Sequence, residues 1–176
     1  METTTHKPLL TGLFRDRDSA ERAYQSISDR GYGRDDVDLV MSDDTRKRHF
    51  SSTDGRTTEL GNKAAEGAGI GGAIGGSLGA IAAAIAAVGT TIAQPGLGLV
   101  IAGPLAAAIA GAGAGAATGG IVGALIGWGI PEERVKEYDA GIRDGGILMA
   151  VRPKSEEDAS FLENSWKSNR GEHVYR

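Results

Sequence analysis

One pattern in the sequence has the form of a phosphate-binding loop. Residues 67–72 read Gly-Ala-Gly-Ile-Gly-Gly, which matches the G-x-G-x-x-G that cradles a dinucleotide pyrophosphate. That function requires a strand immediately before the glycines and an acidic residue about 20 positions after them. Here a polar, helix-like stretch precedes the glycines, and the next charged residue is Glu132. We therefore expect no nucleotide site and no cofactor.

Residues able to bind metals or attack substrates are few and scattered. The chain has no cysteine, and its three histidines, His6, His49 and His173, lack the spacing of metal ligands. Acidic residues cluster at 35–36 and 156–158, where turns and helix starts explain them. The net charge of −4 gives no electrostatic footprint for nucleic acid. We predict that the protein is not an enzyme, holds no metal, and has no nucleic-acid partner and no identifiable small-molecule substrate.

The charges divide the chain into two kinds of sequence. From Gly67 to Pro131, 65 consecutive residues include no Asp, Glu, Lys, Arg or His. All 42 Lys, Arg, Asp and Glu residues therefore lie outside this block, which holds 19 of the 28 glycines. A polar stretch, 44–63, leads into the block and carries the basic run Arg46–His49. That run is either part of a solvated loop or a contact for phosphate, from a lipid headgroup or from nucleic acid.

Glycine recurs at every fourth position along the uncharged block. Proline and glycine at 94–98 and 103–104 divide the block into two predicted helical arms, 64–93 and 104–129. A residue at every fourth position forms one ridge on a helix, and glycine there lets another helix approach closely. The expected helix-packing and oligomerisation residues are Gly67, Gly71, Gly75 and Gly79 in the first arm and Gly111, Gly115, Gly119, Gly123 and Gly127 in the second.

Such arms require an apolar environment. Each glycine costs about 0.8–1 kcal/mol relative to alanine in a solvated helix, so the seven between 67 and 79 cost roughly 6–7 kcal/mol. Each arm, about 40 Å long as a helix, is long enough to cross a bilayer core of about 30 Å. We predict a membrane-embedded helical hairpin that self-associates. The expected membrane-interface anchors are Lys63, Trp128, Arg134 and Lys136.

Two other arrangements fit the same arms. The hairpins of several copies could instead form the shared core of a soluble homo-oligomeric particle or filament, in which case the protein is cytoplasmic. They could also form a membrane-permeabilising assembly. In the membrane prediction the lipid bilayer and further copies of the chain are the partners. Positive charges on both sides of the block, and none in the turn, place both termini in the cytoplasm.

The flanking segments predict a small α/β domain. Before the block, an apolar run at 9–14, a helix opened by Asp18 with Glu21 as a capping box, and an alternating strand at 37–41 form a β-α-β unit. After it, a helix begins at Pro131 and is followed by a strand at 147–151 and a last helix.

The expected fold is α+β, a small three-stranded α/β sandwich of the split, ferredoxin-like kind. Its helices lie on one face of the sheet, and a long Gly/Ala-rich α-helical hairpin interrupts it. The predicted divisions are 1–43 and 130–166 for the two halves of the domain, 44–63 for a polar linker, 64–129 for the hairpin and 167–176 for a polar tail.

These flanks resemble a known bacterial family. The similarity rests on Thr11-Gly12-Leu13-Phe14, on residues 35–40, and on residues 129–148 from Gly-Ile-Pro-Glu-Glu to Gly-Gly-Ile-Leu. Together they are similar to the general stress protein 17M-like family, whose members often carry a Gly/Ala-rich insert. The resemblance implies a stress-associated bacterial protein of unknown molecular activity, and it carries over no catalytic residue to this chain. With the hairpin, it leads us to expect a location at the bacterial inner membrane.

Overall fold

The structure is a computed structural model that describes residues 9–50, 81, 89–94, 97–106, 122–123 and 125–176. It has an α+β fold in which an antiparallel sheet is packed against helices. The elements, in chain order, are β1 (Leu10–Phe14), α1 (Arg17–Asp29), a 3-10 turn η1 (Arg34–Asp36), β2 (Val37–Ser42), α2 (Asp43–Phe50), β3 (Gly89–Gln94), β4 (Leu97–Ala102), α7 (Glu132–Arg143), β5 (Ile147–Val151), α8 (Glu156–Ser168) and β6 (Glu172–Tyr175).

The sheet has the strand order β3-β4-β2-β5-β1-β6, and every neighbouring pair is antiparallel. The three strands expected from the flanks, β1, β2 and β5, are confirmed and lie together at its centre. Val151 of β5 pairs with Leu10 of β1 on one side and with Val37 of β2 on the other. The expectation of only three strands is wrong, because β4 extends the sheet beyond β2 and β6 extends it beyond β1.

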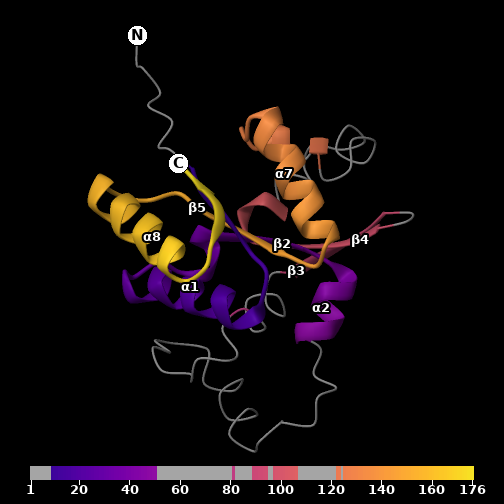
Figure 1. Cartoon of the computed structure of the whole chain (residues 1–176), viewed down its shortest axis with the longest axis horizontal. Coiled ribbons are helices and arrows are strands. Elements are labelled where there is room, and N and C mark those ends of the chain that lie inside the picture. The colour runs from indigo at the N-terminus through magenta and orange to yellow at the C-terminus, as the bar shows by residue number, and fades with distance from the viewer. Residues whose placement is uncertain (1–8, 51–80, 82–88, 95–96, 107–121, 124) are drawn as a thin grey trace, which may run out of the picture.

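Helices cover both faces of this sheet. Side chains alternate along the strands, so β1 places Phe14 in one apolar cluster and Leu13 in the other. The first cluster packs under α1 and α8, and the second under α7. Figure 1 shows α7 on the opposite side of the sheet from α1 and α8. The expected helix layer on one face alone is therefore wrong, since all five residues of β1 and of β5 are buried.

Helix α1 begins two residues earlier than the capping pattern suggested. Asp16, not Asp18, is the N-cap, and its carboxylate accepts a hydrogen bond of 2.8 Å from the backbone N–H of Ser19. Glu21 therefore lies in the second turn and does not reach back to a cap. It is buried instead, with only 4 % of its surface exposed.

Four further segments differ from the sequence expectation. Residues 89–94 and 97–102, assigned to the first arm and the turn, form the paired strands β3 and β4. Asp43–Phe50 is helix α2 rather than linker, and the predicted polar tail contains β6. Strands β4 and β6 pair with β2 and β1, which are distant in sequence, and α2 contacts β4; local composition does not reveal such contacts. The remainder of both predicted arms lies largely outside the described residues.

Candidate functional site

The candidate site is the surface where the insert, residues 51–131, returns to the domain. Strand β4 pairs with β2 from Leu39–Ala102 to Ser42–Leu99, which joins the insert to the central sheet. Besides Leu99 and Ile101 of β4, four apolar side chains of the insert are buried in the cluster beneath α7. They are Leu105, Ala106, Leu125 and Ile130. We call this contact the docking face.

A buried carboxylate, that of Asp38, accepts a hydrogen bond from the first residues of the helical turn that follows β4. Gly103 and Pro104 lead into that turn, and the backbone N–H of Leu105 donates a hydrogen bond of 2.5 Å to Asp38 Oδ1 of β2. Proline suits a first helical position because it has no N–H to satisfy there. Gly103 has φ +103°, and a Cβ at this position would overlap the carbonyl oxygen of Val37. The backbone of the insert can approach Asp38 this closely only with glycine at position 103.

Burial alters the acidity of Asp38. Its side chain lies on the strand face that the alternation pattern assigned to a polar side, but only 3 % of the residue is exposed. Loss of solvation raises the pKa of Asp38 to about 6, against the opposing effects of the Leu105 N–H and the positive charge of Arg152. The carboxylate that accepts the Leu105 N–H is therefore protonated more readily than that of an ordinary aspartate.

A second buried carboxylate meets the insert on the other face of the sheet. Glu21 Oε2 accepts a hydrogen bond of 3.4 Å from the backbone N–H of Ile81, which is itself fully buried. The guanidinium of Arg17 lies 3.8 Å from Glu21 Oε1. Burial raises the pKa of Glu21, while the Ile81 N–H and Arg17 oppose that rise. Both buried carboxylates found in the described residues thus accept a backbone N–H from the insert.

The end of the insert turns sharply into α7. Ile130 N donates to Leu125 O at 3.1 Å and Gly129 N donates to Ile126 O at 2.9 Å, the hydrogen bonds of a Schellman motif. Gly129 has φ +94°, and Leu125 and Ile130 share the apolar cluster beneath α7. The helical segment that contains Leu125 therefore ends at Gly129. The sharp turn also fixes which side of the segment faces the domain.

The last two glycines of the predicted row face away from the domain. No described atom lies within 4 Å of a Cβ placed on Gly123 or Gly127. Their neighbour Ile126 is 46 % exposed, whereas Leu125 is 1 % exposed. The segment therefore docks through Leu125 and presents its glycines outward.

The other predicted site residues differ in where they lie and in what they contact. Lys63 and seven of the predicted glycines lie outside the described residues, namely Gly67, Gly71, Gly75, Gly79, Gly111, Gly115 and Gly119. Trp128 is partly buried against the cluster beneath α7. Arg134 stacks 4.3 Å from the ring centre of Tyr175 and donates to the carbonyl oxygen of Arg176 at 3.3 Å. Lys136 remains exposed, 3.6 Å from Glu132. All three of the proposed anchors that the structure describes contact residues of the domain.

The basic run near residue 46 lies on α2. Asp43 in the first turn of that helix pairs with Arg46 at 2.7 Å and with Lys47 at 2.6 Å. These pairs lower the pKa of Asp43. Two of the positive charges in the run thus share one carboxylate within the helix.

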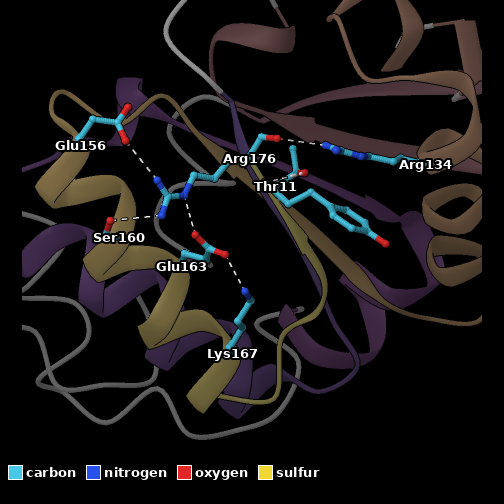
Figure 2. A network of polar contacts seen from close by, with 8 residues as sticks. Thr11, Arg134, Glu156, Ser160, Glu163, Lys167 and Arg176 are labelled. Carbon is cyan, nitrogen blue, oxygen red and sulfur yellow. Dashed lines mark hydrogen bonds and ion pairs between the residues drawn. The ribbon is translucent and has the colours of Figure 1, made fainter.

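Strand β6, at the far edge of the sheet, is held by a polar network (Figure 2). The Arg176 guanidinium lies 2.5 Å from Glu163 and 3.2 Å from Glu156, both on α8. Tyr138 of α7 donates to the carbonyl oxygen of His173 at 2.7 Å and lies 2.7 Å from the hydroxyl of Thr11. Burial raises the pKa of Tyr138 to about 12, so its hydroxyl keeps its proton. No local sequence pattern indicates this network, because its members are far apart in the chain.

Among the helices in the described residues, none is both long and apolar enough to cross a membrane. Over that same part of the chain, no group of three or more acidic or histidine side chains is placed to hold a metal ion. Comparisons of the chain with models of known families, with curated proteins and with solved structures found no match.

Proposed function

We propose that this is a non-enzymatic, stress-associated bacterial protein that self-associates through its glycine rows, with the α/β domain as the scaffold. The observation that carries the proposal is the outward placement of Gly123 and Gly127 on a segment docked through Leu125. The stress association rests on the resemblance of the flanks alone.

Self-association accounts for an otherwise unfavourable choice of residues. Glycine in a solvated helix costs about 1 kcal/mol relative to alanine, and a Cβ at Gly123 or Gly127 would meet no described atom, so packing within the described chain does not require glycine there. The same residues on a second helix allow two backbones to approach closely and gain van der Waals contact. The absence of charge from Gly67 to Pro131 allows that contact to exclude water without burying an ion.

Chain length favours a shared core between copies over a two-span membrane hairpin. Strand β4 is hydrogen-bonded to β2, so the middle of the insert lies on the same side as the domain. Ala106 and Val122 both pack on the docking face, and only 15 residues separate them. From Phe50 to Ile81 there are 30 intervening residues. Crossing a bilayer twice as helices takes about 40 residues, more than either stretch provides.

A membrane-embedded hairpin is the second candidate, favoured by the 65-residue stretch without charge. In that case the β3–β4 pair has to leave the sheet, because a turn on the far side of the bilayer is incompatible with pairing to β2. Leakage from liposomes would mark the membrane-permeabilising form of this candidate.

Sedimentation of the full chain without detergent tests the proposal. We expect a soluble assembly for the wild type and a smaller mass for the double variant Gly123→Leu/Gly127→Leu. Because neither Cβ meets a described atom, this variant should fold as well as the wild type. Ala140→Leu, which adds the same side chain at an exposed position on α7, is the matched control and should keep the wild-type mass. A wild-type monomer at every concentration contradicts the proposal.

A disulfide lock distinguishes the two candidates. The chain has no native cysteine, and Val40 of β2 is directly opposite Ile101 of β4. Cα atoms of antiparallel partners lie about 4.5–5.5 Å apart, within the range of a disulfide. For Val40→Cys/Ile101→Cys we expect the same mass when oxidised and when reduced. Insertion into phosphatidylcholine–phosphatidylglycerol vesicles by the reduced form alone would instead favour the membrane candidate.

A further inference from the structure

The two edges of the sheet differ in how their backbone groups are protected. Among the described residues, β3 pairs only with β4, and β6 pairs only with β1. An edge strand exposes a row of unpaired N–H and C=O groups that another chain can bind. Proteins usually block such edges with short strands, charges, proline or irregular pairing.

Strand β6 carries several of these protective features. It has four residues, and its register with β1 shifts between Thr11 and Leu13. Glu172 begins the strand and pairs with Arg15 at 2.9 Å, while His173 has φ +49°. Arg176 at its end is held to α8 by Glu156 and Glu163 (Figure 2). A further strand could not align with this edge without breaking those contacts.

Strand β3 has none of these protective features. Its sequence, Gly-Thr-Thr-Ile-Ala-Gln, contains no charge and no proline, and it pairs with β4 in continuous register over six residues. The nearest charged residues along the chain are Glu66 and Glu132. Threonine and isoleucine also favour extended structure. Strand β3 is therefore a long, regular and uncharged edge.

The register indicates which backbone groups point outward. Gln94 pairs with Leu97 across a two-residue connection, and hydrogen-bonded and non-hydrogen-bonded pairs alternate from there. Ile92 thus bonds to Leu99 of β4, whereas the N–H and C=O groups of Thr91 and Ala93 point away from β4. These outward groups repeat at every second residue, the spacing that an added antiparallel strand requires.

We propose that β3 is the site where a second copy of this chain adds its own β3, antiparallel and across a two-fold axis. The inference deepens the self-association proposed above and rests on it. Identical antiparallel strands are self-complementary, because the rotation brings each outward N–H opposite a C=O of the partner. The strand has no charge with which to select a charged peptide, while a second copy presents the same neutral strand.

Thr91→Pro tests this pairing in the full-length protein. It removes an outward N–H while leaving the hydrogen bonds between β3 and β4 in place. We expect sedimentation equilibrium to show an assembly with half the wild-type copy number, and a dissociation constant raised roughly tenfold or more. Thr91→Val keeps the N–H and is the matched control, with wild-type mass expected. Far-UV circular dichroism checks that the proline variant is folded.

Amide hydrogen exchange of the unmodified protein gives an independent measurement. We expect the amides of Thr91 and Ala93 to become protected as protein concentration rises, while the amide of Ile92 is protected throughout. Protection of Thr91 that does not depend on concentration would mean that a segment of the same chain covers the edge, which overturns the inference.

The two proposals can fail separately. If the assembly persists in Thr91→Pro at unchanged mass but dissociates in Gly123→Leu/Gly127→Leu, the β3 interface is wrong and the glycine interface stands. If the wild type is monomeric at every concentration, self-association itself is wrong. An assembly that dissociates in Thr91→Pro alone supports β3 and removes the glycine rows as the interface.

Discussion

At one edge of the sheet β6 is held by ion pairs at the surface, whereas towards the other edge β4 is held by apolar burial and one carboxylate. Arg176 and its partners on α8 are partly in water, with Glu156 80 % exposed. Leu99 and Ile101 of β4 are each 2 % exposed, as is Leu105 beyond it, and Asp38 beneath them is 3 % exposed. Exposed ion pairs are weak and sensitive to salt, while a buried carboxylate is sensitive to pH. The two sides should therefore respond to different perturbations.

The largest effect is expected from Gly103→Ala at the β4 side. The added Cβ would overlap the Val37 carbonyl oxygen and force a positive φ on alanine. We expect a loss of about 3 kcal/mol or more in the free energy of unfolding, measured by urea denaturation. Gly129→Ala is the control, since it also has a positive φ but no described atom near its Cβ, and it should cost only about 1 kcal/mol. Equal losses at the two positions would show that β4 is not docked as closely as described.

A pH-dependent effect is expected from Asp38→Asn. The pKa of Asp38 is about 6 in the folded protein against 3.8 for the ordinary side chain. A raised carboxyl pKa means that stability is highest when the group is protonated and falls as pH rises through the folded value. We expect the stability of Asp38→Asn relative to wild type to increase by about 2 kcal/mol between about pH 4.5 and about pH 8.

That comparison needs a control for the other buried carboxylate. Burial also raises the pKa of Glu21, so it contributes with the same sign. Glu21→Gln should leave the pH dependence due to Asp38 intact, and the double variant should remove both contributions. Urea denaturation across the pH range makes the measurement. If Asp38→Asn changes the free energy of unfolding by the same amount at every pH, a titrating group at the docking face is excluded.

The smallest effect is expected from Arg176→Ala at the β6 edge. Loss of its contacts with Glu156 and Glu163 should cost about 0.5–1 kcal/mol, because the pairs are partly exposed. The loss of stability in Arg176→Ala should be smaller in about 1 M salt, where the Debye length is about 3 Å. Lys167→Ala removes another partner of Glu163 without touching β6, so hydrogen exchange of residues 172–175 should rise only in Arg176→Ala. A loss that salt does not reduce would show that packing, not charge, holds β6.

The central elements could be predicted because their patterns are local. The alternation at 37–41, the apolar run at 147–151 and the helix after Pro131 each contain their own signal. Strand β4 could not be predicted in the same way, since Leu-Gly-Leu-Val-Ile-Ala suits a buried strand or a buried helix equally. Strand β6 is short and polar; Thr11 and Tyr138 donate to its carbonyl oxygens, and Arg176, which follows it, is bound to α8.

The candidate site was predictable only in part. The four-residue glycine spacing predicts Gly123 and Gly127 as helix-packing residues, and in the structure they lie on the side of the segment opposite the buried Leu125. The two buried carboxylates were missed. Glu21 was assigned to a cap, and Asp38 to a polar strand face that the insert covers. Whether such a carboxylate is buried depends on which distant segment packs against it, and the periodicity of the local sequence does not indicate that segment.

The sequence alone determined the segregation of charge, the four-residue glycine rows and the β-α-β and α-β-α order of the flanks, because these follow from residue type and spacing. Only the tertiary structure decided that β4 joins the sheet beside β2, that Asp38 and Glu21 are buried against the insert, and that the two sheet edges differ. The reason is that strand pairing and burial are set by contacts between residues far apart in the chain, and the free energy of a buried carboxylate depends on those neighbours rather than on its local sequence.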